Sequence, residues 1–553
     1  MAVYRRGVVW TVLILAISVA SLMGSTAPPL IDAVKRGDRE TVRALLRETG
    51  AVHTSDVDGS TALHWAAQRD DEATLELLLK AGADPKATSR YGMTPLALAS
   101  INGNATIAAR LLAAGADANT AQRSGETVLM TAARTGNVDL VRALLENGAN
   151  VNASEATRGQ TALMWAADEG NTAVALALLQ GGADINARSR APAGAPRGRI
   201  DAFTPVMFAI RAGHIATMQA LLKAGANPND SAEDSTTGLT IAVANAHWEL
   251  AGVLLDSGAD PKAVKQGWTA LHQLVRTRTP NIGQMAGPVQ TGRLSSLDLA
   301  RKLVASGADV NARMTKDMND RQRTRIVWKD STPLLLAAKA ADVEMMRVLV
   351  DLGADPKLTN AVGSSVLGLA AGLAMYHVSE DSGSDEAGVE ATRYALEIGG
   401  GEINQTDEDG ETPLHGAAQR FSPEIAKLLI AHGAKLDVKN HRDATPLMLA
   451  NGFSIINMQR QPRVIELLVS EMTARGLPIE MWPAGQARIS ENVFDIDPTA
   501  ADVVFRHGDT GEAQAARLKA AAEAKATAEA EAKAKADAKA KADADAVKRR
   551  PPG

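Results

Sequence analysis

The sequence predicts an all-α-dominated repeat solenoid, and three observations support this. A Thr-x-Leu signature returns about every 33 residues, for example at Thr61 and Thr94. A Gly-Ala-Asp tripeptide or a close relative follows most signatures by 21 positions, as Gly82 follows Thr61 and Gly115 follows Thr94. Between signature and tripeptide lie two short amphipathic runs, neither of which can bury its apolar stripe alone, so the repeats must stack. We expect about 12 repeats over residues 28–476.

The repeat that begins at Thr94 shows how each element is encoded. Thr94 can cap a first helix, and Pro95 suits the first helical turn because that position needs no amide donor. Gly103 then ends the helix. Apolar residues at one, three and four positions apart over 107–112 predict a second helix, and Gly115 is typical of a helix C-terminus. The repeats begin at Pro28, Thr61, Thr94, Thr127, Thr161, Thr204, Thr237, Thr269, Thr332, Ser365, Thr412 and Thr445.

These motifs resemble the ankyrin repeat family. The resemblance rests on Thr-Ala-Leu-His at 61–64, Thr-Pro-Leu-His at 412–415 and Gly-Ala-Asn-Val-Asn at 148–152, and it covers roughly four-fifths of the chain. It implies helix–loop–helix–β-hairpin units in a curved solenoid whose inner helices and hairpin tips line a protein-binding groove. It also implies that His64, His272 and His415 bond to neighbouring backbone rather than act in chemistry.

Composition and motifs argue against an enzyme. The 553 residues include no Cys, which excludes disulfides, thiolate metal sites and a Cys nucleophile. No zinc-protease, nucleophile-elbow, phosphate-loop or dinucleotide motif is present, so we expect no catalytic, cofactor or metal residues. The segments 56–59 and 407–410 look like calcium loops but lack the flanking acids, and we expect hairpin turns there. A formal net charge of −5 disfavours nucleic acid as a partner.

The N-terminus has the layout of a secretory signal. Arg5 and Arg6 precede an uncharged apolar run over 8–23, followed by the small residues 24–27. We therefore interpret 1–27 as a signal peptide and expect a periplasmic or secreted protein. The alternative is an uncleaved N-terminal membrane anchor, although the run is short for a span of about 20 residues.

Two insertions between repeats are predicted to lengthen hairpin tips on one edge of the stack. The first holds four Arg and no acid, and the second holds six basic residues against two Asp. Because Arg and Trp are enriched at binding hot spots, we expect these basic fingers to contact an acidic surface of a partner protein. Solvated loops without a partner are the alternative. The predicted partner-binding residues are Arg188, Arg190, Arg197, Arg199, Arg321, Arg323, Arg325 and Trp328.

Two further insertions fall inside repeats, at 277–293 and 376–390, where we expect loops at the helix–helix turn. The second is acidic, which leaves cation or basic-partner binding as an alternative. The repeats at Thr237 and Ser365 depart from the signature and are predicted to be local soft points.

Beyond the array, residues 477–510 are interpreted as an irregular cap. Residues 511–553, in which Ala alternates with Lys, Glu or Asp, are interpreted as a charged helical or disordered tail.

The sequence therefore predicts a non-enzymatic, monomeric protein-binding scaffold of the cell envelope. Two alternatives remain: a docking subunit of an envelope enzyme system, and a secreted effector that binds host or competitor proteins. Trp65 and Trp165 occupy equivalent places in their repeats, and this regularity predicts packing residues rather than a ligand site.

Overall fold

The structure is a computed structural model, and it describes residues 28–48, 50–192, 202–264, 267–278, 289–317, 327–374, 384–452 and 461–481. The predicted signal peptide, the charged tail and all but the first five residues of the predicted cap lie outside these ranges. The chain divides into two compact parts, which we call the N-terminal half (1–242 with 256–259) and the C-terminal half (243–255 with 260–553).

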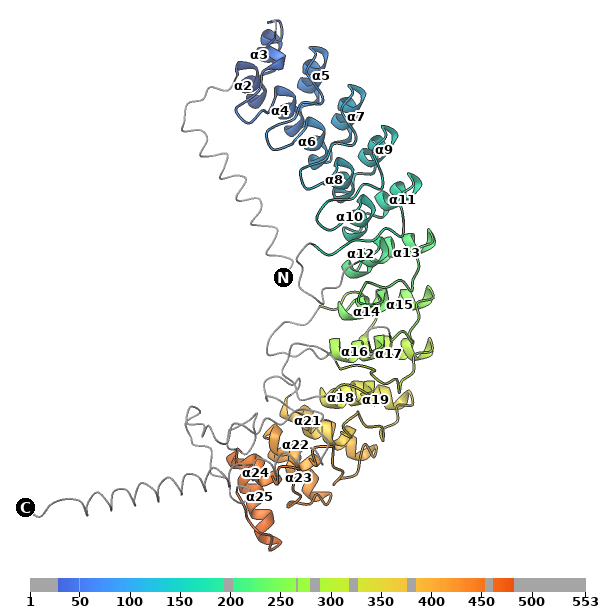
Figure 1. Ribbon diagram of the computed structural model, residues 1–553, viewed down its shortest axis with the longest axis vertical. Coiled ribbons are helices and arrows are strands. Elements are labelled where there is room, and N and C mark those ends of the chain that lie inside the picture. Colours follow the sequence, from blue (N-terminus) through green and yellow to red (C-terminus); the bar gives the residue numbers. More distant parts are fainter. Residues whose placement is uncertain are drawn as a thin grey trace, which may run out of the picture. The chain divides into compact units, whose positions relative to one another are not determined.

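The N-terminal half is a stack of helix pairs, as predicted. In Figure 1 the first helices of the pairs form one row and the second helices form another. Each first helix packs on the next first helix, and each second helix packs on the next second helix. The elements are α2 (Pro29–Arg36), α3 (Arg39–Leu45), η3 (Ala51–His53), α4 (Ala62–Gln68), α5 (Glu72–Lys80), α6 (Pro95–Asn102), α7 (Ala105–Ala113), α8 (Val128–Thr135), α9 (Val138–Glu146), α10 (Ala162–Asp168), α11 (Thr172–Gln180), α12 (Pro205–Ala212) and α13 (Ile215–Lys223).

The C-terminal half continues the same alternation, after α14 (Gly238–Ala244) and α15 (Trp248–Asp256), where the chain passes from one half to the other. Its helices also pair, and from α18 on each pair stacks on the preceding one. They are α16 (Ala270–Arg278), α17 (Ser296–Ala305), α18 (Pro333–Lys339), α19 (Val343–Asp351), α20 (Val366–Ala371), α21 (Asp385–Glu397), α22 (Pro413–Arg420), α23 (Pro423–Ala431), α24 (Pro446–Ala450) and α25 (Pro462–Ala474).

Local chemistry sets the helix ends where the sequence predicts them. The Ala97 amide donates to Thr94 Oγ1 at 3.1 Å, and Pro95 occupies the first turn of α6. Gly103 closes that helix with φ 69°, a left-handed conformation in which a side chain would be strained. Asn104 then caps α7 by accepting from the Ile107 amide at 3.0 Å. In this repeat, Thr94 and Asn104 therefore start the two helices, and Gly103 ends the first.

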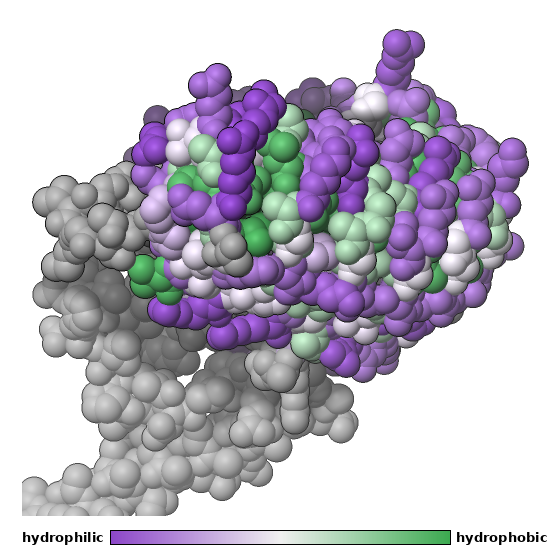
Figure 2. Space-filling view, turned by 90° about the horizontal axis from the view of Figure 1, so that it is seen from above, coloured by the Kyte–Doolittle hydropathy of each residue, from purple (hydrophilic) through white to green (hydrophobic). Residues whose placement is uncertain are grey.

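Small buried residues let the first helices lie close together. Ala66, Ala99, Ala132 and Ala166 are fully buried at equivalent places in successive repeats, beside fully buried leucines such as Leu63. In the view of Figure 2, hydrophilic side chains cover most of the visible described surface, and hydrophobic ones form small separate patches. The apolar side chains are thus buried between successive repeats rather than in one globular core.

The connections between repeats are tight turns rather than extended β-hairpins. Among the described residues they form isolated antiparallel bridges only, such as Ser55 with Thr61 and Ala121 with Thr127. The two segments that resemble calcium loops are turns, as predicted. The Gly59 amide donates to Asp56 O at 2.9 Å, and the Gly410 amide donates to Asp407 O at 3.0 Å.

The described bases of both basic insertions lie in the connections between repeats, as predicted. The Ser189 amide donates to Phe203 O at 3.0 Å, which closes the base of the first insertion. The Met314 amide donates to Ser331 O at 3.0 Å, which closes the second. That both lie on one edge of the stack stays a prediction, because they belong to different halves.

The prediction for the acidic insertion is partly wrong. Residues 385–390 are not a loop, because α21 begins at Asp385 and extends the second helix of its repeat to 13 residues. Ser384 caps it by accepting from the Ala387 amide, and Asp385 and Glu386 lie in the first turn, where negative charge favours a helix. The acids therefore serve helix initiation, while residues 375–383 lie outside the described ranges.

Candidate protein-binding face of the first helices

One surface of the N-terminal half brings together aromatic rings and cations from neighbouring repeats. It is formed by the eighth residues of the signatures, by fifth residues that remain accessible, such as Trp65 and Trp165, and by the hairpins that adjoin the first-helix row. We call it the first-helix face (Figure 1). These positions project from the first helices away from the second helices, because positions two, three, six and seven, including Leu63 and Ala66, are buried in the stack.

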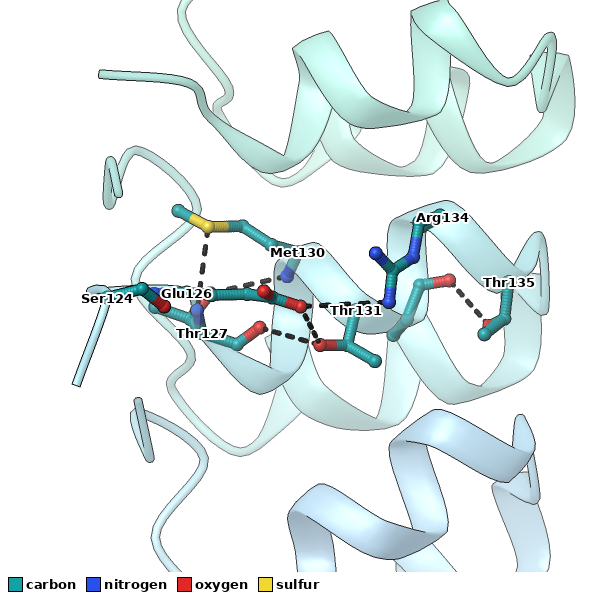
Figure 3. Close-up of polar contacts among 8 residues, drawn as sticks. Ser124, Glu126, Thr127, Met130, Thr131, Arg134 and Thr135 are labelled. Atoms are coloured by element: carbon teal, nitrogen blue, oxygen red, sulfur yellow. Dashed lines mark hydrogen bonds and ion pairs between the residues drawn. The ribbon is translucent and has the colours of Figure 1, made fainter. Parts of the chain in front are cut away.

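The centre of this face is a stacked pair from two neighbouring repeats. The Arg134 guanidinium lies over the half-buried Trp165 ring, 5.0 Å from its centroid. Glu126 pairs with Arg134 at 3.8 Å and accepts from Thr131 Oγ1 at 3.0 Å, as Figure 3 shows. The carboxylate thus helps to hold the guanidinium over the ring, where the negative face of the π-system attracts it.

The same arrangement appears at the start of the stack. Lys35 Nζ lies 4.3 Å from the centroid of Trp65 and 2.6 Å from Asp56 Oδ2. Lys35 and Arg134 both hold the eighth place of their repeats, and Trp65 and Trp165 both hold the fifth place of the next. As the sequence predicts, the two Trp pack regularly, each against a cation of the preceding repeat. Both residues nevertheless remain partly exposed.

A third cation–aromatic group lies one repeat further along. Arg211 stacks on Phe208 at 4.8 Å and on Phe203 at 5.6 Å, and its Nη2 pairs with Asp168 at 2.7 Å. In the C-terminal half a cation–aromatic contact joins two second helices instead, where Arg347 on α19 lies 4.4 Å from the ring of Tyr394 on α21. Cations on this face are therefore positioned by aromatic rings and carboxylates of adjacent repeats.

A shallow hollow of about 180 Å³ opens beside Trp165, between the hairpins of two repeats. The indole Nε1 of Trp165 is buried without a hydrogen-bond partner in the described part of the chain. A hollow with a ring edge and mixed charges can receive a single polar side chain of another protein, and it is too small for a typical small-molecule ligand of 300–1,000 Å³. The hollow is lined by Ser124, Glu126, Glu155, Thr157, Arg158, Gln160 and Trp165.

The signature histidines are structural, as the sequence predicts. The Thr61 amide donates to His64 Nδ1 at 3.1 Å, so the ring proton is on Nε2, which donates to Met93 O of the next repeat at 3.0 Å. His272 makes the same bridge to Ser331 O at 3.1 Å, across the second basic insertion. Burial lowers the pKa of His64 and lowers that of His272 to about 4, which keeps both rings neutral near pH 7.

The described residues of the first basic finger help to build the array. Arg188 pairs with Asp230 and donates from Nη1 to Ser231 O at 2.9 Å. Arg190 donates from Nη2 to Ala156 O at 2.6 Å. Both guanidinium groups remain exposed, so each anchors a hairpin while keeping donors open to another molecule.

In the second basic finger, Trp328 is half-buried at the base, with its indole Nε1 buried and without a partner among the described residues. Its backbone carbonyl accepts from the Ser331 amide at 2.9 Å. The other predicted partner-binding residues lie outside the described ranges. They are Arg197, Arg199, Arg321, Arg323 and Arg325.

Sequence reasoning missed three arginines that continue the row of Arg190. Arg90, Arg123 and Arg158 are exposed at the tips of the three preceding hairpins. The signal was available, because each precedes a turn glycine by one or two positions and they lie 33 and 35 residues apart. These arginines lie on hairpins without a long insertion, where the repeat spacing marks nothing unusual.

The described residues contain no cluster of His, Asp or Glu that could hold a metal ion. Within the same part of the chain, no helix is both long and apolar enough to cross a bilayer.

Comparison with known families decides what the repeats are. A family model described as "Ankyrin repeats (3 copies)" matches residues 30–122, 110–189, 206–285 and 384–474, and one described as "Ankyrin repeat" matches 329–361. The chain belongs to the ankyrin repeat family. Ankyrin repeats imply a scaffold for protein–protein interaction.

Curated relatives share ankyrin repeats but are much longer proteins. The E3 ubiquitin-protein ligase KEG of Arabidopsis thaliana is 26% identical over 258 residues, which is 45% of this chain and 14% of that protein. The phosphocholine transferase AnkX of Legionella pneumophila is 23% identical, over 38% of this chain and 21% of AnkX. Human neurogenic locus notch homolog protein 1 is 29% identical, over 29% of this chain and 5% of that protein.

Proposed function

We propose that this chain is an exported, non-enzymatic scaffold that holds a partner protein in the cell envelope. The observation that carries the proposal is the first-helix face, where Trp65 and Trp165 keep half-exposed rings under cations positioned by neighbouring repeats. Aromatic and Arg side chains held in one orientation lose little entropy on binding and are typical of interface hot spots.

The two arginine-rich hairpins supply the second part of the proposal. Arg188 and Arg190 are exposed at the first of them, and Arg321, Arg323 and Arg325 belong to the second. They favour an acidic surface on the partner, since opposite charges steer association. The layout of residues 1–27 supports export, with the membrane reached only through that segment.

Site-specific photo-crosslinking in the native cell tests the binding face. Ile101 on α6 is 43% exposed on the first-helix face, and Leu176 on α11 is 41% exposed on a second helix, so the two form a matched pair. A photo-reactive amino acid at position 101 is expected to capture one reproducible partner protein, and the same amino acid at position 176 is not. Equal capture at both positions would contradict the assignment of the face.

Charge reversal of Arg321, Arg323 and Arg325 to Glu tests the basic fingers in the same cells. Recovery of the crosslinked partner is expected to fall several-fold, because the variant would repel an acidic surface. Unchanged recovery of the partner would show that the basic fingers do not contribute to the interface. Finding the native protein in the culture medium rather than the envelope would favour a secreted effector instead.

A further inference from the structure

The hairpin tips of the N-terminal half carry a row of exposed arginines, one on each of four consecutive repeats. Arg90, Arg123, Arg158 and Arg190 occupy these tips. The row differs from the two inserted fingers because three of its members sit on hairpins of ordinary length. We call it the arginine row.

Three of the four arginines are held in place by the repeats before them. Arg90 Nη2 donates to Val57 O at 2.7 Å, Arg123 Nη2 donates to Arg90 O at 3.2 Å, and Arg190 Nη2 donates to Ala156 O at 2.6 Å. Each contact links a guanidinium to the backbone of the preceding hairpin. A guanidinium has five N–H donors. Each of these three groups uses one N–H to fix its orientation, and its other N–H groups can bind a ligand.

Carboxylates near the arginine row are already engaged elsewhere. Glu126 pairs with Arg134 on the first-helix face. Glu155 is buried and accepts from the amides of Thr157 and Arg158 in its own hairpin, both at 2.6 Å. The four tips therefore present positive charge without an exposed acid between them. The row begins at Arg90, because the hairpin one repeat earlier carries Asp58 at its tip.

The spacing of the row selects the shape of its ligand. Packed helices lie about 8–10 Å apart, so hairpins of successive repeats advance by about that distance. A polyproline II helix has three residues per turn and rises about 3.1 Å per residue, so every third side chain returns to one side after about 9.3 Å. A β-strand returns a side chain to one side every second residue, after about 6.6 Å, and does not match.

We propose that the arginine row binds an acidic, proline-rich segment of a partner protein in the polyproline II conformation, with an acidic side chain at every third position. Tyr91, which is 70% exposed next to Arg90, provides the aromatic surface on which such segments pack. The inference rests on the proposed role as a protein-binding scaffold and specifies the chemistry of one partner segment. A polynucleotide fits less well, because its phosphates follow one another every 3.4 Å along each strand of a duplex.

Fluorescence anisotropy with synthetic peptides and the full chain tests the proposal. The first probe is a peptide of four Pro-Pro-Glu triplets, and the second has the same composition with its four Glu in one central block. The test variant carries Arg90→Gln, Arg123→Gln, Arg158→Gln and Arg190→Gln. The control variant removes four exposed cations from second helices instead, through Lys80→Gln, Arg110→Gln, Arg142→Gln and Lys223→Gln.

At low ionic strength the triplet peptide is expected to bind about tenfold more tightly than the blocked peptide. The arginine-row variant is expected to lose about tenfold in affinity, as four solvent-exposed ion pairs would contribute, while the control variant keeps its affinity. Each single Arg→Gln variant is expected to lose about twofold, which keeps the test valid if the fourfold variant is poorly folded.

Equal binding of the two peptides, or equal loss in the two variants, would overturn the proposal. Tighter binding of an oligothymidine with the same dependence on the arginine row would assign the row to nucleic acid instead. None of these outcomes touches crosslinking at Ile101, so failure of this inference is distinguishable from failure of the proposed scaffold function.

Discussion

Arg134 and Trp165 stack across the junction of two ankyrin repeats, with the guanidinium carbon 5.0 Å from the centroid of the ring. The contact joins the eighth residue of one signature to the fifth residue of the next, and Lys35 with Trp65 repeats it at 4.3 Å. It places an aromatic ring on the first-helix face and joins neighbouring repeats at the same time.

The first prediction concerns the energy of this coupling. A double-mutant cycle with Arg134→Met and Trp165→Leu is expected to give a coupling of about 0.5–1 kcal/mol in the free energy of unfolding, the size of a solvent-accessible cation–π contact. Denaturant unfolding of the four proteins measures it. Arg142→Met, on the second helix α9, should instead be additive with Trp165→Leu. Additivity of the Arg134 pair would mean that the stack contributes nothing.

The second prediction is a loss of stability in mild acid. Burial lowers the pKa of His272 to about 4 from an ordinary 6.5, and it lowers the pKa values of His64 and His415 in the same direction. Below pH 6.5 His272 is protonated in the unfolded chain, whereas in the folded protein it stays neutral until the pH approaches 4. Stability is therefore full above pH 6.5 and falls as the pH drops toward 4, by up to roughly 3 kcal/mol for His272.

Denaturant unfolding between pH 7 and pH 4 checks this slope. His272→Gln is expected to be less stable at pH 7, because the bridge from Thr269 to Ser331 O is lost. It should also lose part of the pH dependence, since Gln does not titrate. A variant with the full wild-type slope would show that other groups produce it.

The third prediction is that Asp407→Asn stabilises the protein at pH 7. Burial raises the pKa of Asp407 well above its ordinary value, and the nearby Glu411 carboxylate raises it further. Its Oδ1 accepts from the amides of Asp409 and Glu411 at 3.0 and 2.9 Å, which an Asn oxygen can also do. Asn440, at the same place in the next hairpin, accepts from two amides of its turn in that way.

We expect a gain of about 0.5–1 kcal/mol at pH 7, because the fold favours the neutral acid over the charged one. A raised carboxyl pKa contributes stability below the unfolded value of about 3.8 and loses it as the pH rises, so the gain from Asn should shrink toward pH 4. The reverse change, Asn440→Asp, should destabilise, since it would place a second carboxylate against Glu411. Thermal unfolding at pH 7 and pH 4 measures both.

The fourth prediction tests the close approach of α20 and α22. A Cβ on Gly416 would lie 2.6 Å from the Leu373 amide nitrogen, a backbone atom that cannot turn aside. Gly416→Ala is expected to destabilise by about 1–3 kcal/mol, the cost of overpacking. Gly252→Ala in α15 meets only side-chain atoms, the nearest at 3.1 Å, and should be neutral or stabilising. Similar changes in the free energy of unfolding for the two variants would contradict the close approach of Gly416 to Leu373.

Local sequence rules sufficed for the elements of each repeat. Thr94, Pro95, Gly103 and Asn104 act through neighbours at most four residues away, so a single repeat specifies its own helix ends. The same holds for the turn at Asp56 and for the bond from His64 to Thr61. The prediction of a loop at Asp385 is wrong, because Ser384 caps a helix that begins there.

Position five of the signature separates what sequence decides from what it does not. The signature alone determined that Trp165 and Gly416 occupy equivalent places on first helices, because the 33-residue period sets the fold. Only the tertiary structure decided that Trp165 is partly exposed under Arg134, while Gly416 is buried against Gly372 and Leu373. The reason is physical: exposure depends on how the adjacent repeat packs, and that contact joins residues about 30 to 45 positions apart.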